Sequence, residues 1–183
     1  RRMQKIIDGY SDHVIICGYG RIGSIVAREI LAEDVPVVIV ESNPEVIRLL
    51  DEHGVPYVAG DATAHDVLLA AGLERAKTLV AALTQEAANV YVTLTARQLN
   101  PAIRIVARAD AQGHTHRLQR AGADQVLVPH LYGGVRMAQS VLRPTVVNFL
   151  ELTGRSGPVG LQMEELQVTD HSEVVGKNLI DSQ

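Results

Sequence analysis

The chain has 183 residues, of which 46% are hydrophobic, so it can bury the core of one ordinary α/β domain and part of another. Its formal net charge of −4, with Lys and Arg scattered along the sequence, argues against a nucleic-acid partner. The single cysteine, Cys17, excludes a disulfide framework within the chain, and no apolar run approaches the roughly 18 residues that cross a bilayer, which together predict a soluble cytosolic chain.

Short apolar segments alternate with helical ones over most of the sequence. We expect strands over residues 14–17, 36–40, 55–59, 78–82, 103–107 and 125–128. We expect helices over residues 21–32, 43–52, 65–71, 85–99 and 111–121, the second with Asn43 as N-cap and Pro44 at its first position. This alternation predicts an α/β fold with a doubly wound parallel six-stranded Rossmann sheet, and the order 3-2-1-4-5-6 follows by analogy with dinucleotide-binding folds.

The segment from Tyr132 to Leu152 has the pattern of a helix broken near Pro144, because proline removes a helical hydrogen bond. Two placements remain open: the two helices pack on their own sheet, or they dock on a second subunit. The second is favoured because six strands already have enough covering helices. The partial alternation of residues 161–168 indicates a strand of another unit, and we expect further sequence beyond both ends of the chain.

A GxGxxG pattern, formed by Gly18, Gly20 and Gly23, lies between the first strand and the first helix, which is the context of a dinucleotide-binding loop. The helix N-terminus presents free N–H groups to phosphates. Glu41 ends the second strand 18 residues beyond Gly23, where a carboxylate can accept hydrogen bonds from both ribose hydroxyls and would repel a 2′-phosphate. The sequence therefore predicts NAD or an adenosine di- or triphosphate rather than NADP.

Other strand ends supply further candidate ligands, because open α/β sheets bind ligands at the carboxyl ends of their strands. Asp61 follows the third strand and could accept the adenine amino group or serve as a helix N-cap or turn residue; both interpretations remain open. Arg21 and Arg108 are candidate phosphate ligands.

Catalytic groups are not evident. A dehydrogenase needs an acid or base positioned at its substrate, but the seven histidines are dispersed, and we expect each at the surface or at a helix end. The HExxH, Walker A and GxSxG motifs do not occur. The sequence predicts a binding domain and not an enzyme.

Several longer motifs accompany the glycine loop: Val14-Ile-Ile-Cys-Gly-Tyr-Gly-Arg-Ile-Gly23, Gly60-Asp-Ala-Thr63, Arg104-Ile-Val-Ala-Arg108 and Gly122-Ala-Asp124. With these motifs the chain resembles the RCK domain, the regulator of K⁺ conductance, of the Trk-type NAD-binding class. The resemblance implies four segments: a linker from an upstream pore over 1–11, a Rossmann nucleotide-binding lobe over 12–131, a helix-crossover-helix dimerisation segment over 132–155, and the start of a truncated C-terminal lobe over 156–183.

The resemblance also implies a nucleotide site, with the glycine loop and Arg21 at the phosphates, Glu41 at the ribose, Asp61 and Thr63 on the adenine side, and Arg108 at a further contact. Some ATP-binding members carry a cation-holding glutamate after the sixth strand, where this chain has His130, so NAD or ADP is favoured over a cation-bridged ATP. The cofactor is thus expected to be NAD(H) or an adenine nucleotide, ADP, ATP or AMP. Ca²⁺ near Asp61 and Asp66 is a less favoured alternative. The full candidate set is Gly18, Tyr19, Gly20, Arg21, Ile22, Gly23, Glu41, Ser42, Asp61, Ala62, Thr63, Ala82, Leu83 and Arg108.

By the same resemblance, the function is regulatory. The domain would form a homodimer, or an octameric ring, at the cytoplasmic face of the cell membrane and control K⁺ flux through a channel pore in the same chain. The basic run Arg1–Lys5 favours this channel interpretation. The alternatives are a soluble regulatory subunit of a K⁺ transporter's membrane protein, a small NAD-dependent oxidoreductase, and a Rossmann scaffold that binds no nucleotide.

Overall fold

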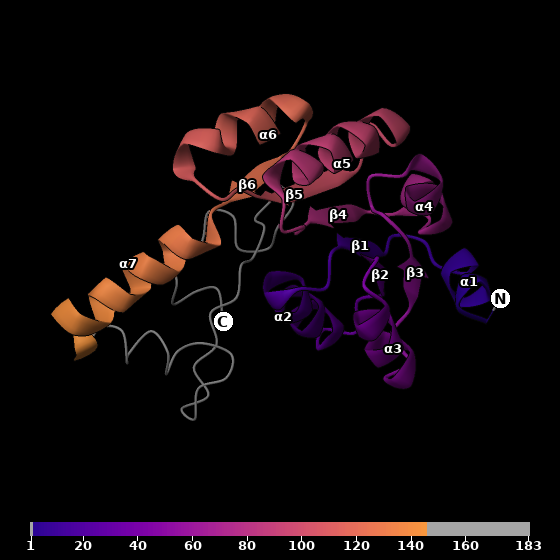
Figure 1. Ribbon diagram of the computed structural model, residues 1–183, viewed down its shortest axis with the longest axis horizontal. Helices are drawn as coiled ribbons and strands as arrows, with labels where there is room; N and C mark the ends of the chain where they lie inside the picture. Colours follow the sequence, from indigo (N-terminus) through magenta and orange to yellow (C-terminus); the bar gives the residue numbers. More distant parts are fainter. Residues whose placement is uncertain (1, 146–183) are drawn as a thin grey trace, which may run out of the picture. The chain divides into compact units, whose positions relative to one another are not determined.

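A six-stranded sheet, with every strand parallel to its neighbours, forms the centre of the computed structural model, which describes residues 2–145 (Figure 1). The strand order β3-β2-β1-β4-β5-β6 confirms the predicted order. The order reverses between β1 and β4, so their carboxyl ends flank the crevice where such sheets bind ligands. The strands are β1 (Val14–Cys17), β2 (Val37–Glu41), β3 (Tyr57–Ala59), β4 (Thr78–Ala81), β5 (Arg104–Arg108) and β6 (Gln125–Leu127).

Two of the predicted helices differ in extent from the expectation. The helix expected over residues 111–121 divides into a 3₁₀ turn and a shorter α-helix, and the last helix begins at Pro129 rather than Tyr132. That helix ends at Leu142, before Pro144, and the rest of the predicted helix pair and C-terminal lobe lies outside the described residues. The helices are α1 (Arg2–Asp8), α2 (Arg21–Leu31), α3 (Pro44–Glu52), α4 (His65–Ala70), α5 (Glu86–Leu99), α6 (Thr115–Ala121) and α7 (Pro129–Leu142), with 3₁₀ turns η1 (Leu73–Arg75) and η2 (Gln112–His114).

Helix α1 falls within the segment expected to be a linker, and the sequence analysis did not anticipate it. Its Ile7 is fully buried in the core, and the Gln4 side chain donates a hydrogen bond to the Ala70 carbonyl oxygen at 3.0 Å. Arg75, at the end of η1, donates to the Tyr10 and Ile7 carbonyl oxygens at 3.2 and 3.3 Å. These contacts attach α1 to the body of the domain.

The central strands β1, β2 and β4 are buried along nearly all of their length, which explains their continuous apolar runs. Ile15 and Cys17 of β1 pack on the face covered by α1, α4, α5 and α6, whereas Val14 and Ile16 pack on the face covered by α2 and α3 (Figure 1). Burying each such aliphatic side chain contributes about 1.5–3 kcal/mol, so the sheet positions are the main source of stability.

The second face is covered unevenly within the described residues. Helices α2 and α3 lie over β1, β2 and β3, and beside them an apolar hollow of about 460 Å³ extends over β4, β5 and β6. Its lining includes Ile22 and Val26 of α2 and Val80, Val106 and Leu127 of the sheet. The expectation that the six strands have enough covering helices is therefore wrong for this half of the face in residues 2–145.

Candidate functional site

The glycine loop joins β1 to α2, and each of its three glycines meets a different constraint. Gly18 has φ +92°, which favours glycine, and a Cβ there would lie 3.2 Å from both the Ala82 carbonyl oxygen and the Leu83 side chain. A Cβ on Gly23 would collide with the Gly18 carbonyl oxygen, so this glycine allows α2 to start close to the strand. A Cβ on Gly20 would meet nothing within 4 Å, so its backbone faces open space.

Glu41 lies at the end of β2, the strand next to β1, and holds the glycine loop through a hydrogen bond to its backbone. Its Oε2 accepts a hydrogen bond from the Tyr19 N–H at 2.8 Å. Its Oε1 accepts from the Ser42 and Asn43 N–H groups at 2.8 and 2.9 Å. These three backbone bonds fix the carboxylate at the rim of the glycine loop. The structure thus brings Glu41 and Ser42 together with Gly18–Gly23, and the bond to Tyr19 was not foreseen from the sequence.

Asp61 and Thr63 form a turn after β3. The Asp61 Oδ1 accepts hydrogen bonds from the Thr63 N–H and from the Thr63 hydroxyl, both at 2.8 Å. The bond from the Thr63 N–H, which has the larger effect, and the bond from the Thr63 hydroxyl hold the pKa of Asp61 below its ordinary value. Asp61 therefore closes this turn and is not the N-cap of α4, which is Ala64. Ala62, within this turn, is buried, and the Gly60 N–H donates a hydrogen bond to the Glu41 carbonyl oxygen at 2.9 Å, so the turn lies beside the end of β2.

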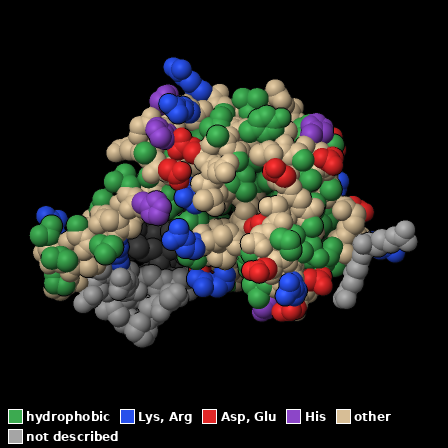
Figure 2. Space-filling model, in the orientation of Figure 1, with side chains coloured by type: hydrophobic (Ala, Val, Ile, Leu, Met, Phe, Trp, Pro, Cys, Tyr) green, Lys and Arg blue, Asp and Glu red, His purple; other side chains and the backbone are tan. Residues whose placement is uncertain are grey.

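Across the crevice from Glu41, the ends of β4 and β5 line a hollow of about 160 Å³. Arg108 is mostly buried, and its Nη2 pairs with Asp110 at 2.9 Å. Its Nε is buried without a hydrogen-bond partner in the described structure. Figure 2 shows Lys or Arg and His side chains gathered near the middle of the face that it draws. The hollow is lined by Gly20, Arg21, Ile22, Ala82, Thr84, Arg108 and His130.

Asn89 connects the two strand ends on this side of the crevice. It is 1% exposed, and its Oδ1 accepts from the Leu83 N–H at 2.9 Å. Its amide nitrogen donates to the Leu83 and Arg108 carbonyl oxygens at 3.0 and 3.1 Å. The backbone that carries Leu83 and the backbone that carries Arg108 are thereby joined by one side chain.

Two histidines make contacts that sequence reasoning did not assign. His13 is fully buried, so of the two expected positions, at the surface or capping a helix, the first is wrong for it. Its Nε2 lies 2.9 Å from the carbonyl oxygen of Ala71, the C-cap residue of α4, which agrees with the second. His114 pairs with Glu86 at 2.9 Å. Burial raises the pKa of Glu86, but hydrogen bonds from the Asp110 N–H and from His114 outweigh it and leave the pKa lowered. Residues 2–145 contain no group of three or more His, Cys, Asp or Glu side chains that could hold a metal ion.

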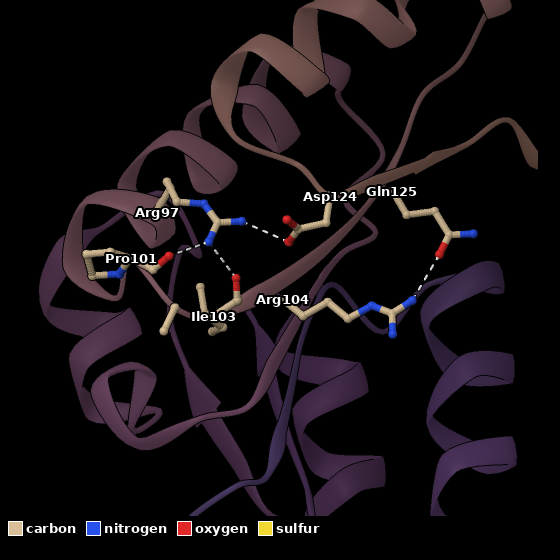
Figure 3. Close-up of a pocket in the computed structure, with 7 residues that line it drawn as sticks. Arg97, Pro101, Ile103, Arg104, Asp124 and Gln125 are labelled. Carbon is tan, nitrogen blue, oxygen red and sulfur yellow. Dashed lines mark hydrogen bonds and ion pairs between the residues drawn. The ribbon is translucent and has the colours of Figure 1, made fainter. Parts of the chain in front are cut away.

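A larger hollow, of about 590 Å³, lies at the opposite edge of the sheet, where β5 and β6 begin (Figure 3). Arg97 of α5 donates to the Pro101 and Ile103 carbonyl oxygens, each at 2.7 Å, and to the Asp124 carboxylate at 2.8 Å. Two further bonds reach the Gly122 carbonyl oxygen. All five N–H groups of this guanidinium are therefore used within the chain, and the hollow is a packing junction rather than a ligand site.

Comparison with known proteins defines the family. The model of the TrkA-N domain matches residues 14–129, which run from the start of β1 to the start of α7. The chain belongs to the TrkA-N domain family. This confirms the resemblance to the N-terminal part of RCK domains that was inferred from the motifs.

The chain has relatives among potassium channel proteins. The chain is 35% identical over 189 residues to "Probable potassium channel protein 2" of Methanocaldococcus jannaschii, and the alignment covers 100% of this chain and 55% of the relative. It is 37% identical over 152 residues to "Potassium channel protein 1" of the same organism, covering 82% of this chain and 46% of the relative. The chain thus spans about half the length of these relatives.

Solved structures of similar domains include nucleotide-bound forms. The TrkA-N domain of the Escherichia coli inner membrane protein ybaL is 31% identical, with a TM-score of 0.67, and the match covers 75% of this chain and 98% of that one. The GsuK channel bound to NAD is 27% identical, with a TM-score of 0.60 and coverage of 66% and 22%; GsuK has also been solved bound to ADP. The Kef C-terminal domain of Shewanella denitrificans, in its AMP-bound form, is 27% identical, with a TM-score of 0.62 and coverage of 75% and 87%.

Within the described residues, no helix of this TrkA-N domain is both long and apolar enough to cross a membrane.

Proposed function

We propose that this TrkA-N domain senses a nucleotide and regulates potassium flux through a membrane protein, which is a channel pore in the same polypeptide. The observation that carries the proposal is the pairing of an open backbone at Gly20 with a carboxylate fixed at the loop rim, Glu41. The family's channel relatives and the NAD-, ADP- and AMP-bound structures of similar domains support it. A soluble regulatory subunit of a potassium transporter is the second candidate, which the sequence analysis left open.

In the proposed complex the ligand lies across the crevice between β1 and β4. The glycine loop, with Gly18, Tyr19, Gly20, Arg21, Ile22 and Gly23, holds the phosphates at the N-terminus of α2. Glu41 and Ser42 contact the ribose, and Asp61, Ala62 and Thr63 form the adenine side. Ala82, Leu83 and Arg108 form the opposite wall. NAD(H), ADP, ATP or AMP fits this arrangement, and Glu41 disfavours NADPH because it repels a 2′-phosphate.

Gly20→Ala tests the site directly, because an added methyl group has room in the empty loop but obstructs a phosphate approaching the backbone. We expect NAD or ADP at about 100 times its dissociation constant to add about 2.7 kcal/mol of stability and raise the unfolding midpoint of the wild type by about 5 °C or more. The Gly20→Ala variant should show little shift. Gly113→Ala is the matched control, because a Cβ there also meets nothing within 4 Å and Gly113 lies in η2, outside the candidate set.

The outcomes separate the alternatives. Failure of every nucleotide to shift the wild-type midpoint would contradict the proposed function and favour a scaffold without a ligand. Equal shifts for wild type and Gly20→Ala would show that the nucleotide binds elsewhere. Oxidation of NADH in the presence of carbonyl compounds would support the oxidoreductase alternative.

We also propose that the domain self-associates through α7 and the residues that follow it, as a homodimer that can build a ring. Met137, Val141 and Leu142 of α7 are 73%, 80% and 77% exposed, which is unusual for three large apolar residues on one helix. Light scattering after size-exclusion chromatography should give a dimer for the wild type and a monomer for Met137→Glu/Val141→Glu.

A pore sequence upstream of Arg1 in the full gene would identify the channel, and its absence the transporter subunit.

A further inference from the structure

Helix α1 lies beside the edge strand β3 and is attached to the segment of residues 70–75, between α4 and β4 (Figure 1). Gln4 donates to the Ala70 carbonyl oxygen, and Arg75 donates to the carbonyl oxygens of Ile7 and Tyr10. Ile7 is fully buried, whereas the other described side chains of α1 are half-buried or exposed. A helix of seven residues is marginally stable by itself, so α1 can detach at a lower free energy than the whole domain unfolds.

His13 contacts the same segment. It is fully buried, its ring centroid lies 5.9 Å from that of Tyr10, and its Nε2 lies 2.9 Å from the Ala71 carbonyl oxygen. Because a carbonyl oxygen only accepts, Nε2 carries the proton of the neutral ring and Nδ1 carries none. The Nδ1 atom is buried without a hydrogen-bond partner in the described structure. A second proton on the ring would therefore make Nδ1 a buried donor without an acceptor, which is costly.

Arg75 connects the charge of His13 with the position of α1. A Cβ placed on Gly72 would lie 3.0 Å from the His13 Cε1 and 3.1 Å from the Arg75 Nη2, so the imidazole and the guanidinium flank one point. The same Nη2 donates to the Ile7 carbonyl oxygen. A positive charge on His13 would repel this guanidinium, and Arg75 is exposed, so its side chain can turn into water and give up its bonds to α1.

The charges around His13 oppose its protonation in the folded chain. Burial, the largest cause, and the charge of Arg75 lower the pKa of His13 more than the Ala71 carbonyl oxygen and the charge of Asp12 raise it. The remaining charged or titratable side chains of the elements packed around the ring are exposed, where water screens them. They are Lys5 and Asp8 of α1, His65 and Asp66 of α4, Glu74 of η1, and Lys77 before β4.

The other elements that enclose His13 are held more firmly than α1. Strand β1 pairs with β2 on one side and with β4 on the other. Leu68 of α4 and Leu73 of η1 are fully buried, and Asn100 donates to the carbonyl oxygens of Leu73 and Ala76. Helix α1 is therefore the element that moves at the lowest free-energy cost when the ring is charged.

We propose that His13 is a pH-sensitive latch, whose protonation releases α1 from a domain that stays folded. Detachment of α1 and Tyr10 lets water reach the ring and lets Arg75 turn away from the new charge. The latch does not depend on the nucleotide site. Where α1 is joined to a channel pore, as in the proposed function, acidification loosens the joint between the pore and the domain.

The test is hydrogen exchange of the whole chain, followed by mass spectrometry, at pH 7.5 and 5.5, with protection factors corrected for the intrinsic exchange rate at each pH. The amides of Gly9, Tyr10 and Asp12 report on α1 and its attachment, because each donates a backbone hydrogen bond there. The amides of α5 report on the whole domain. We expect α1 to be far less protected than α5 at both pH values, and its protection to fall about five- to tenfold from pH 7.5 to 5.5.

Two histidine variants assign the pH dependence. His13→Gln keeps a donor for the Ala71 carbonyl oxygen but cannot become charged, so the protection of α1 in this variant should not depend on pH. His53→Gln is the matched control, because His53 is exposed and lines a hollow together with Met3 and Ile6 of α1. This variant should keep the pH dependence of the wild type.

Arg75→Met tests the latch without changing a histidine, and it serves also where His13→Gln does not fold. The variant removes the bonds to the Ile7 and Tyr10 carbonyl oxygens. The protection of α1 should fall severalfold already at pH 7.5, and that of α5 should stay close to the wild-type value.

Each of the following results would overturn the latch. Equal protection of α1 and α5 at both pH values would show that α1 opens only when the whole domain unfolds. A wild-type protection of α1 that is the same at pH 7.5 and 5.5 would show that no proton is involved. A pH dependence that persists in His13→Gln, or is lost in His53→Gln, would belong to another group. Unchanged protection of α1 in Arg75→Met would show that the guanidinium does not hold this helix.

Discussion

Gly23 and Gly20 lie in the same loop but respond oppositely to an added methyl group. A Cβ on Gly23 would overlap the Gly18 carbonyl oxygen, so the start of α2 would have to move away from β1, whereas Gly20 has open space around it. We expect Gly23→Ala to lower the free energy of unfolding by about 1–3 kcal/mol, the usual cost of overpacking. Gly20→Ala should change it by less than about 1 kcal/mol. Urea denaturation measures both, and equal losses would contradict the assigned geometry.

Arg97 makes its contribution through backbone carbonyl groups (Figure 3). Its removal leaves the carbonyl oxygens of Pro101, Ile103 and Gly122 without this donor. We expect Arg97→Met to destabilise the domain by about 2–4 kcal/mol, because unsatisfied carbonyl groups remain and the Asp124 carboxylate keeps only its bond from the Ile105 N–H. Arg104→Met, at an exposed position of the same hollow, is the control and should cost under about 1 kcal/mol in guanidinium denaturation. Similar losses in the free energy of unfolding for the two variants would show that the hydrogen bonds of Arg97 add little to stability.

At the scale of elements, His13 connects the start of β1 with the end of α4. The pKa of His13 is lowered overall. Burial, the largest cause, and the charge of Arg75 lower this pKa, whereas the bond to the Ala71 carbonyl oxygen and the charge of Asp12 raise it. The unfolded chain therefore binds this proton at a higher pH than the folded chain, so stability falls as the pH drops through about 6.5. The slope from one proton is at most about 1.4 kcal/mol per pH unit. His13→Gln should flatten the dependence of the free energy of unfolding on pH between pH 7.5 and 5.5. His65→Gln, at an exposed position, is the control and should leave this dependence unchanged. Equal slopes for the wild type and His13→Gln would refute the assignment of this dependence to His13.

The acidic groups act in a separate pH window. The pKa values of Asp61, Glu86 and Asp124 are all lowered in the folded chain. For Asp124, burial raises the pKa, but the bonds from the Ile105 N–H and from Arg97 outweigh it. Stability from these carboxylates is fully present above their ordinary pKa values, near 4, and is lost as the pH falls further. The effect of His13 can therefore be measured without interference from them.

At the scale of the whole molecule, Cys17 reports on global unfolding. It is fully buried in the middle of the sheet, and burial raises its pKa to about 12, so the reactive thiolate is neither formed nor accessible in the folded chain. We expect negligible reaction with Ellman's reagent at pH 8 in native buffer and complete reaction in concentrated urea. Because the chain has one cysteine, Cys17→Ser should abolish the signal. Rapid labelling at a rate independent of urea would show that the sheet opens locally.

Most of the fold could be predicted because its signals are local. The apolar run of Val14–Cys17, the glycine loop and the cap at Asn43 each have a short-range physical cause, and the structure shows all three, with the Asn43 side chain accepting from the Glu45 N–H. Helix α1 was missed because its stability depends on burying Ile7 beneath a distant element. The second half of the sheet was misjudged because helix count does not determine which face each helix covers.

In the candidate site, too, local features could be predicted from the sequence, and contacts between distant segments could not. Residues of the glycine loop and Glu41 could be identified from their spacing. The hydrogen bond between Glu41 and the Tyr19 N–H, and the grouping of Arg21, Arg108 and His130 around one hollow, depend on how separate strand ends converge in space. A basic residue at or shortly after the carboxyl end of each of the strands β1, β5 and β6 was the available signal, because the carboxyl ends of parallel strands meet at one edge.

The Asn89 bridge has a consequence for binding kinetics. Since one buried amide holds the backbone at Leu83 and at Arg108, this wall of the crevice becomes ordered when the chain folds and not when a ligand arrives. A ligand therefore loses little free energy to immobilising this wall, and its association rate should be governed by diffusion and charge rather than by a slow rearrangement. A domain built in this way can follow rapid changes in ligand concentration.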